Sequence, residues 1–326
     1  MKRICFIIPY FGHLPNYFNL FLKSCSFNPN FNWLLITDDC SEYNFPPNFK
    51  VIYMTFQENQ KLIQSKFDFP ITLNRAYKLC DYKPAYGYIY EEYIKGYTHW
   101  GHCDTDILIG DLSKFLTDDI LSNYDKLFCL GHMTIYKNTL DNNRVFMTPI
   151  NGHQIYKEVF SSSLSFCFDE VWKDDNNVNT LFQLKNKKIL LSDYSLNIDF
   201  TKTKFIRVIY VGKDKPNNGH GYIYEKYKRY IYTWNRGSII RYSKEKEQLK
   251  QEEYMYIHLQ KRKMKLNIEC LTSNIIKIVP NAFLPLEETN ITLENFNRIK
   301  KWTFNNHFWR IHCLPKLKKI RKIISI

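Results

Sequence analysis

The sequence predicts an α/β fold built around an open, largely parallel sheet. Apolar runs that end at turn or acidic residues are typical of buried central strands, and helical patterns follow the first and the third of them. This alternation of strand and helix is typical of α/β folds. The predicted strands are residues 4–8, 32–37 and 50–56, and the predicted helices are residues 16–24 and 56–66.

The rest of the chain continues less regularly. Residues 84–95 read as a helix with Pro84 in its first turn, where proline is tolerated, and this helix leads into a strand that carries two aspartates. Aromatic alternation over residues 222–242 predicts a hairpin. Further strands are predicted at residues 126–136, 188–191, 205–211 and 252–259.

Size and composition indicate a folded chain with one large domain, or one domain with appendages. The 326 residues are 44% hydrophobic and 17% aromatic, which excludes a disordered chain and allows a sizeable core. The nine cysteines form no Cys-x-x-Cys pair and several lie in apolar runs, so we expect free thiols in a reducing compartment. No run approaches 18 apolar residues, and we expect a cytoplasmic protein.

The net charge of +14 is concentrated at the C-terminus. Residues 310–326 hold six Lys or Arg and no acid, and from Pro315 onward apolar residues recur at helical spacing. This pattern predicts a basic amphipathic helix on an anionic membrane, which would place the protein on the inner membrane face. The alternative is a terminal helix that docks on the core and exposes a basic face.

The motif Asp104-x-Asp106 is the strongest chemical signal. In an extended segment, residues i and i+2 lie on one face, so the two carboxylates would form an oxygen site suited to Mg²⁺ or Mn²⁺. A solvated turn is the alternative. Because ligands bind at the carboxyl ends of strands in open α/β sheets, we expect Asp38 and Asp39 to converge on the same place.

Taken in order, these motifs resemble those of bacterial glycosyltransferases of the GT-A fold, and most of all an uncharacterised family found among capsular and lipopolysaccharide sugar transferases. The resemblance covers residues 1–265 and leaves residues 266–326 as a C-terminal extension. It implies a Rossmann-like nucleotide-binding sheet with an integrated acceptor region. The matching segments are residues 37–39, 81–87, 104–106, 131–138, 168–170 and 256–262.

The resemblance implies a divalent cation, Mn²⁺ or Mg²⁺, that bridges the diphosphate of a UDP-sugar. Asp106 would bind the cation directly, Asp104 would contact the cation or the donor ribose, and His258 would be a late third ligand. The alternative for His258 is an ordinary core or surface histidine. Other expected donor contacts, for which helix capping and solvated lysines are the alternatives, are Tyr10, Asp38, Asp39, Asp81 and Lys83, with Lys261 and Arg262 on phosphate.

An inverting transfer needs a carboxylate that accepts the proton of the acceptor hydroxyl. Asp169 and Glu170 are the candidates, and we expect only one to serve, because adjacent side chains usually diverge. A helix N-cap is the alternative for this pair. Inversion is favoured over retention, although the sequence leaves both open. His132, Asn138 and Arg144 are expected to shape the acceptor pocket, as the resemblance implies.

The predicted function is therefore transfer of a hexose such as galactose from a UDP-sugar to a growing, lipid-linked surface glycan. A metal-dependent nucleotidyltransferase also uses paired carboxylates and is the main alternative. The chain lacks the phosphate-binding loops GxxxxGK[ST] and GxGxxG. A basic nucleic-acid-binding protein is the weaker alternative, because the basic excess is terminal and we expect no nucleic-acid partner.

Overall fold

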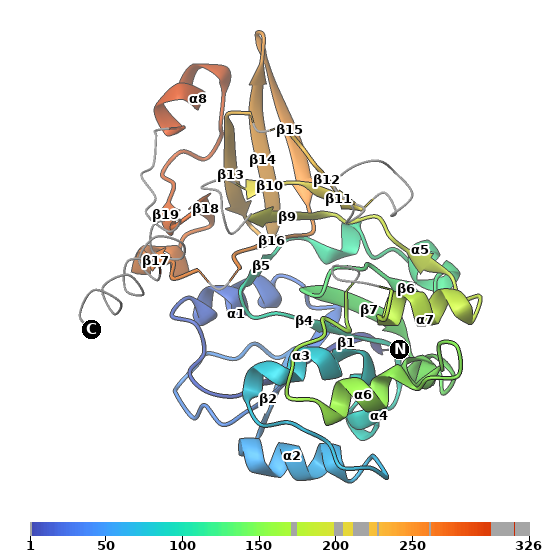
Figure 1. Cartoon of the computed structure of the whole chain (residues 1–326). Helices are drawn as coiled ribbons and strands as arrows, with labels where there is room; N and C mark the ends of the chain where they lie inside the picture. The colour runs from blue at the N-terminus through green and yellow to red at the C-terminus, as the bar shows by residue number, and fades with distance from the viewer. Residues whose placement is uncertain are drawn as a thin grey trace.

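The computed structural model describes residues 2–170, 175–198, 205–210, 222–226, 228–260, 262–300 and 316. Within these ranges the chain forms a mixed α/β structure with several sheets, which confirms the predicted α/β class (Figure 1). The predicted basic helix of residues 310–326 lies outside the described residues, Lys316 excepted. Within the described part of the chain, no helix is both long enough and apolar enough to cross a bilayer.

The largest sheet in the described residues has seven strands, in the order β3-β2-β1-β4-β7-β6-β8. Its first four strands run parallel, and β7 runs antiparallel to β4. The apolar runs at residues 4–8 and 32–37 lie in the first two strands of the chain, as predicted, whereas the run at 50–56 is a strand only to Tyr53, because α2 begins at Phe56. The strands are β1 (Lys2–Tyr10), β2 (Phe31–Thr37), β3 (Phe49–Tyr53), β4 (Tyr97–Cys103), β6 (Lys126–Leu127), β7 (Met133–Lys137) and β8 (Ile189–Leu190).

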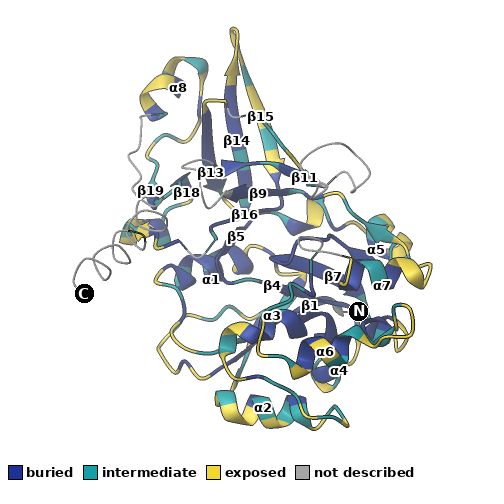
Figure 2. Ribbon diagram, in the orientation of Figure 1, coloured by how far each residue is buried: buried dark blue, intermediate teal, exposed yellow. Residues whose placement is uncertain are grey.

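This central sheet is buried on both faces (Figure 2). On one face Ile4, Phe6 and Ile8 of β1 pack in a cluster with α1 and Leu121, and on the other face Cys5 and Ile7 pack in a cluster with α2, α3, α4, α6 and α7. Alternate side chains of a strand point to opposite faces, which is why an unbroken apolar run suits this position. The helices are α1 (Phe18–Ser26), α2 (Phe56–Gln64), α3 (Leu79–Tyr82), α4 (Tyr86–Ile89), α6 (Ile155–Ser161) and α7 (Val178–Leu184).

A second sheet, in the order β10-β9-β16-β5, joins distant parts of the chain. The strand β16 lies between β9, to which it is parallel, and β5, to which it is antiparallel. The aspartate pair therefore lies in the connection between β4 and β5, where the chain passes from one sheet to the other, and not within one strand as predicted. The strands are β5 (Ile107–Ile109), β9 (Ser195–Ile198), β10 (Phe205–Ile206) and β16 (Tyr256–His258).

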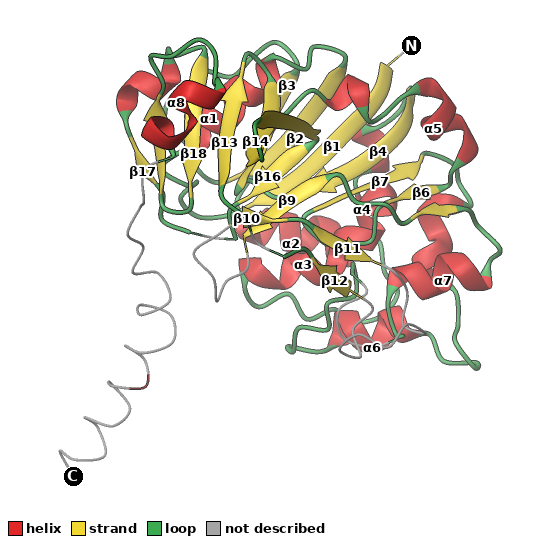
Figure 3. Ribbon diagram, turned by 90° about the horizontal axis from the view of Figure 1, so that it is seen from above, coloured by secondary structure: helices red, strands yellow, loops and turns green. Residues whose placement is uncertain are grey.

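A third sheet rises away from the α/β layers in Figure 1 and lies at one end of the molecule in Figure 3, with α8 (Leu293–Ile299) beside it. The predicted hairpin is formed by β13 and β14, although residues 222–224 belong to a separate pair, β11 (Val208–Tyr210) with β12 (Tyr222–Tyr224). The sheet consists of β13 (Tyr230–Asn235), β14 (Ser238–Glu245), β15 (Gln248–Tyr254), β17 (Lys265–Leu266), β18 (Ile275–Val279) and β19 (Ala282–Pro285). Strands from both sides of residue 265 belong to this third sheet. The predicted domain boundary at residue 265 stays a prediction.

Three predicted elements are divided in the structure. Residues 84–95 form short turns of helix, 126–136 form two strands, and 252–259 form the end of β15 followed by β16. In the second case Phe128 has a φ of 71°, a left-handed conformation that a strand cannot contain. The remaining helices are α5 (Asp118–Asn123) and the 3₁₀ segments Ala76–Lys78, Lys83–Ala85, Glu91–Tyr93, Leu112–Lys114, Asn142–Met147 and Ile268–Leu271.

Candidate metal and catalytic site

The two aspartates of the motif are held by different sheets. The backbone N–H of Asp104 donates to the carbonyl oxygen of His132 next to β7, at 2.9 Å. The carbonyl oxygen of Asp106 accepts from the N–H of Leu259 at the end of β16, at 2.8 Å. The pairing of β16 with β5 therefore brings His258 next to Asp106.

Asp104, Asp106 and His258 form one cluster. Each offers a ligand atom, and these atoms lie within 4.8 Å of one another. Nε2 of His258 is 3.6 Å from Oδ1 of Asp106. Although burial favours the neutral ring, the two carboxylates raise the pKa of His258. Two carboxylate oxygens and one imidazole nitrogen are a donor set that suits Mn²⁺ and also Mg²⁺, so the three predicted ligands lie together and fit a divalent cation.

Lys83 connects this cluster to the predicted catalytic acids. Its Nζ lies 2.8 Å from Oδ1 of Asp104 and 3.4 Å from Oδ2 of Asp169, and it donates to the carbonyl oxygen of Gly131 at 2.6 Å. Burial opposes the charge of this ammonium, but the carboxylates of Asp104 and Asp169 outweigh that effect and raise the pKa of Lys83. Lys83 is therefore a fixed positive charge beside the cluster.

Asp169 and Glu170 converge on Gly131 and do not diverge as predicted. The backbone N–H of Gly131 donates to Oε2 of Glu170 at 3.1 Å. A Cβ at Gly131 would lie 2.6 Å from Oδ2 of Asp169 and 3.0 Å from Oε2 of Glu170, so any side chain here would displace these oxygens. Burial raises the pKa of Asp169, the ammonium of Lys83 lowers it, and Glu170 and Asp104 raise it further, so the net pKa lies above its ordinary value. Asp169 is buried, whereas Glu170 is partly exposed.

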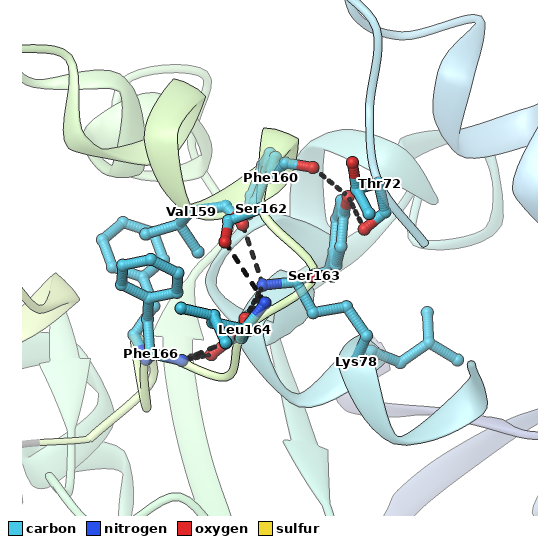
Figure 4. Close-up of polar contacts among 12 residues, drawn as sticks. Thr72, Lys78, Val159, Phe160, Ser162, Ser163, Leu164 and Phe166 are labelled. Carbon is cyan, nitrogen blue, oxygen red and sulfur yellow. Dashed lines mark hydrogen bonds and ion pairs between the residues drawn. The ribbon is translucent and has the colours of Figure 1, made fainter. Parts of the chain in front are cut away.

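A buried ion pair fixes the segment that leads to these acids, and Figure 4 shows its lysine, Lys78, among residues 159–166 of that segment. Nζ of Lys78 lies 2.8 Å from Oδ2 of Asp81 and donates to the carbonyl oxygens of Val159 and Leu164. The Asp81 carboxylate in turn accepts from the backbone N–H of Phe166. Asp81 is 1% exposed, so it has a structural role, and its side chain offers no open oxygen for the nucleotide contact that the sequence predicted.

Asp38 and Asp39 hold the loop that follows β1. The exposed Asp38 accepts from the N–H of Gly12 at 2.7 Å, and the buried Asp39 accepts from the N–H of Leu14 at 2.9 Å. Burial opposes the ionised form, but these and further hydrogen bonds lower the pKa of Asp39 to about 2. Tyr10 lies close enough to both Asp106 and Asp39 for their charges to raise its pKa, after the larger effect of burial. Asp39 and Asp106, which were predicted to lie near one another, are thus both neighbours of Tyr10.

The other predicted site residues are more scattered. Arg262 is buried at 3% exposure close after β16, and Lys261 lies outside the described residues. His102, which lies next to the motif in the sequence but was not predicted as a ligand, is buried against the rings of Tyr86 and Tyr136 and does not join the cluster. Asn138 donates to backbone oxygens at residues 94 and 97, and Arg144 lies over the ring of Tyr88 in the helical layer, so neither is placed to shape a pocket at the cluster.

Three residues beside His258 were not predicted as parts of its surroundings: Asn197, Tyr256 and, in this role, His132. Nδ1 of His258 lies 2.8 Å from Oδ1 of Asn197, and Nδ2 of Asn197 lies 3.2 Å from Nε2 of His132. Nδ1 of His132 lies 2.6 Å from the hydroxyl of Tyr256. The only sequence signal is the i, i+2 spacing of polar residues in two short strands, Ser195-x-Asn197 and Tyr256-x-His258.

Comparison with known protein families identifies the family of this chain. A model described as a family of unknown function, DUF6625, matches residues 6–287. The chain belongs to this family. No curated protein matches the chain. Among solved structures, the galactosyltransferase LgtC in complex with donor and acceptor sugar analogs aligns at 10% identity over 60% of this chain and 75% of its own, with a TM-score of 0.34. A score this low does not establish a shared fold.

Proposed function

We propose that this protein is a metal-dependent glycosyltransferase that moves a hexose from a UDP-sugar to a growing glycan. One observation carries the proposal: two aspartates and a histidine, from segments about 150 residues apart, place their ligand atoms within 4.8 Å at the carboxyl end of β4. The charged neighbours Lys83 and Asp169 support it, as does the resemblance of the ordered motifs to GT-A enzymes.

In this proposal Asp104, Asp106 and His258 hold Mn²⁺ or Mg²⁺, as their donor atoms suit. When bound, the cation supplies positive charge against the negative charge that develops on the departing diphosphate. Lys83 stays beside Asp104, where its ammonium adds a second positive charge and holds the carboxylate in place. Tyr10 and Asp38, at the ends of β1 and β2, are the residues proposed to border the nucleoside.

The acceptor proton is proposed to go to an acid of the Asp169-Glu170 pair. A base works best when its pKa lies near the working pH, and burial raises that of Asp169 in this direction. Glu170 is the more exposed of the two and is held on Gly131, so it is the better placed to meet an acceptor hydroxyl. With a base of this kind the transfer inverts the anomeric centre.

A donor screen tests the proposal directly. The full chain is incubated with UDP-, GDP- and CMP-sugars, with and without Mn²⁺, and its thermal unfolding is measured. We expect a rise in the unfolding temperature only with a UDP-sugar and Mn²⁺ together, because ligands that bind the folded state stabilise it. A product assay then separates transfer of sugar from transfer of nucleotide, which distinguishes a glycosyltransferase from a nucleotidyltransferase.

The variant Asp106→Asn removes one negative ligand and keeps the shape of the side chain. We expect it to lose the Mn²⁺-dependent shift and the transfer of sugar, whereas Asp119→Asn, a change at an exposed aspartate of α5, keeps both. Full transfer activity in Asp106→Asn would overturn the metal role. The lipid-linked acceptor and the inner membrane face are proposed from the basic pattern of residues 310–326 alone.

A further inference from the structure

The connection that leads from α6 to Asp169 has no regular structure. The helix α6 ends at Ser161, and residues 162–170 form no helix or strand. The backbone N–H and C=O groups of such a segment need partners elsewhere in the molecule, because these groups are costly to bury without a hydrogen bond. Charged side chains of residues 78–83 supply several of these partners.

Lys78 holds the first half of this segment (Figure 4). Its Nζ donates to the carbonyl oxygens of Val159, near the end of α6, and of Leu164. The same ammonium lies 5.1 Å from the centre of the Phe166 ring, a cation–π contact. The side chain of Lys78 is fully buried, so water does not compete for these contacts.

Asp81 holds the second half. The backbone N–H of Phe166 donates to both oxygens of the Asp81 carboxylate at 3.1 Å, and the N–H of Phe168 donates to Oδ1 at 3.4 Å. Between these two residues Cys167 has a φ of 55°, a left-handed conformation that costs energy in a residue other than glycine. One carboxylate therefore binds the chain on both sides of a strained residue, immediately before Asp169.

The stretch that carries Lys78 and Asp81 continues to Lys83, which contacts the acid itself. Nζ of Lys83 lies 3.4 Å from Oδ2 of Asp169 and 2.8 Å from Oδ1 of Asp104. Residues 78–83 thus bind both the backbone before the acid pair and a side chain of that pair. The position of the pair relative to the Asp-x-Asp motif is set by this one buried stretch.

The buried charges of Lys78 and Asp81 are not explained by stability alone. Replacement of a buried ion pair by apolar residues of similar volume is often neutral for stability or favourable. An apolar pair, however, could not bind two carbonyl oxygens and two N–H groups of another segment. What the ion pair adds is the orientation of that segment.

We propose that Lys78 and Asp81 set the backbone of residues 164–168 and, through it, the direction of Asp169 and Glu170. They are positioning residues in this proposal, because they act through the backbone and do not touch the substrate. The proposal rests on the catalytic acid pair of the proposed function and adds the residues that hold it in place.

The first measurement needs no substrate. The variant Asp81→Asn keeps the shape of the side chain but turns one acceptor oxygen into an NH₂ group, which cannot accept. We expect hydrogen–deuterium exchange in peptides that cover residues 162–170 to become about tenfold faster or more, because hydrogen bonds to a charged group are lost. Peptides from α2 serve as the internal reference. Unchanged exchange over residues 162–170 would overturn the proposal.

A matched control breaks a different buried ion pair. In the third sheet, the guanidinium of Arg241 lies 2.8 Å from Oε2 of Glu252, and the arginine side chain is 4% exposed. Glu252→Gln should therefore lower the stability of the protein in urea while residues 162–170 exchange as in the unchanged protein. Equally fast exchange of this segment in Glu252→Gln and Asp81→Asn would mean a general loss of stability and would count against a specific hold.

The second measurement separates the rate from substrate binding. For Asp81→Asn we expect kcat to fall roughly 10- to 100-fold, because a catalytic group misplaced by about 1 Å can cost about 100-fold in rate. The KM of the UDP-sugar should stay within about twofold, since the proposed metal ligands are unchanged. A normal kcat in Asp81→Asn would reject the positioning role. If the unchanged protein transferred no sugar, the proposed function would fail, and the exchange measurement would still decide whether Asp81 holds the segment.

Two double variants distinguish positioning from packing. Lys78→Met with Asp81→Asn removes the buried charge that has lost its partner, so it should be more stable in urea than Asp81→Asn alone. Its kcat should stay low, because the N–H groups of Phe166 and Phe168 still lack the carboxylate. Recovery of kcat together with stability would show a structural role only.

The other double variant tests the strained residue. Glycine adopts the left-handed conformation without the cost that a side chain brings, so Cys167→Gly reduces the need for the hold that Asp81 provides. Cys167→Gly with Asp81→Asn should therefore have a kcat about fivefold higher or more than Asp81→Asn alone. Absence of this rescue in a folded double variant would contradict the proposal.

Discussion

Nζ of Lys83 lies 3.4 Å from Oδ2 of Asp169, so a lysine predicted to contact the donor and an acid predicted as catalytic base form one buried ion pair. The same ammonium reaches Asp104 at 2.8 Å. The donor side and the acceptor side of the proposed reaction thus share one positive charge. A change in either carboxylate is expected to affect the other through Lys83.

The variant Lys83→Met leaves the carboxylates of Asp104 and Asp169 without their cation. Removal of one partner from a buried ion pair costs about 3 kcal/mol of unfolding free energy, which urea denaturation measures. The exposed pair of Lys114 and Glu253 is the control, and Lys114→Met should cost less than about 1 kcal/mol. Because the second change removes an unpaired buried charge, Lys83→Met with Asp169→Asn should be more stable than Lys83→Met alone. A smaller loss for Lys83→Met than for Lys114→Met would contradict this account.

The variant Gly131→Ala should separate metal binding from catalysis. The new Cβ would displace the oxygens of Asp169 and Glu170, while Asp104, Asp106 and His258 are untouched. Misplacement of a catalytic group by about 1 Å can cost about 100-fold in rate, which a sugar-transfer assay detects. Mn²⁺ affinity should fall far less than the rate, because the change reaches Asp104 only through Lys83. Gly152→Ala, where no atom lies within 4 Å of the new Cβ, is the control for backbone strain at an exposed loop.

Lys126 makes stability depend on pH. Burial lowers the pKa of this fully buried lysine to about 7, well below the ordinary value of 10.5 that it would have in the unfolded chain. Between these two values the unfolded chain binds more protons than the folded one, so the contribution of Lys126 to stability rises with pH from about 7 to 10.5. We expect the stability of the unchanged protein minus that of Lys126→Met to increase across this range, by at most about 1.4 kcal/mol per pH unit.

Urea denaturation at several pH values between 7 and 10 measures that difference. The subtraction cancels the buried tyrosines and cysteines, whose raised pKa values act in the opposite direction. Lys114→Met again serves as the control, with a difference that stays flat. A flat difference for Lys126→Met would mean that the lysine stays charged on its partners, Asn179 and the carbonyl oxygen of Phe128.

Deletion of residues 310–326 tests the proposed membrane contact. The segment carries six cationic residues and no acid, so its loss should weaken binding to vesicles that contain anionic lipid, as measured by co-sedimentation. Turnover with a soluble acceptor should change much less. Neutral vesicles are the control, and equal binding of both chains to anionic vesicles would reject the membrane role of this segment.

The sequence predicted best what depends on local pattern. The first three strands of the chain follow from apolar runs, and α2 begins at Phe56, where the predicted strand was expected to end; Thr55 caps this helix through a capping box with Glu58. The cluster of Asp104, Asp106 and His258 was predicted from the Asp-x-Asp spacing and from the resemblance, which implies a late histidine ligand. The break at Phe128 was missed, since nothing in the residue type announces a φ of 71°.

What the sequence could not predict depends on contacts between distant segments. Asp81 looks like an ordinary acid next to Lys83, and only the fold shows that it accepts from the backbone N–H of Phe166. The convergence of Asp169 and Glu170 on Gly131 likewise needs the turn that brings residues 131 and 169 together. The partners of His258 were missed because the register between β9 and β16 is set by the whole sheet.

The position of β16 between β9 and β5 also has a consequence for biosynthesis. A nascent chain exposes both aspartates of the motif long before residue 258 has been synthesised. The proposed metal-binding cluster therefore cannot be completed on the ribosome until residue 258 has emerged. The complete cluster would form only late in synthesis, and fragments that end before residue 258 would contain the two aspartates without the third proposed ligand.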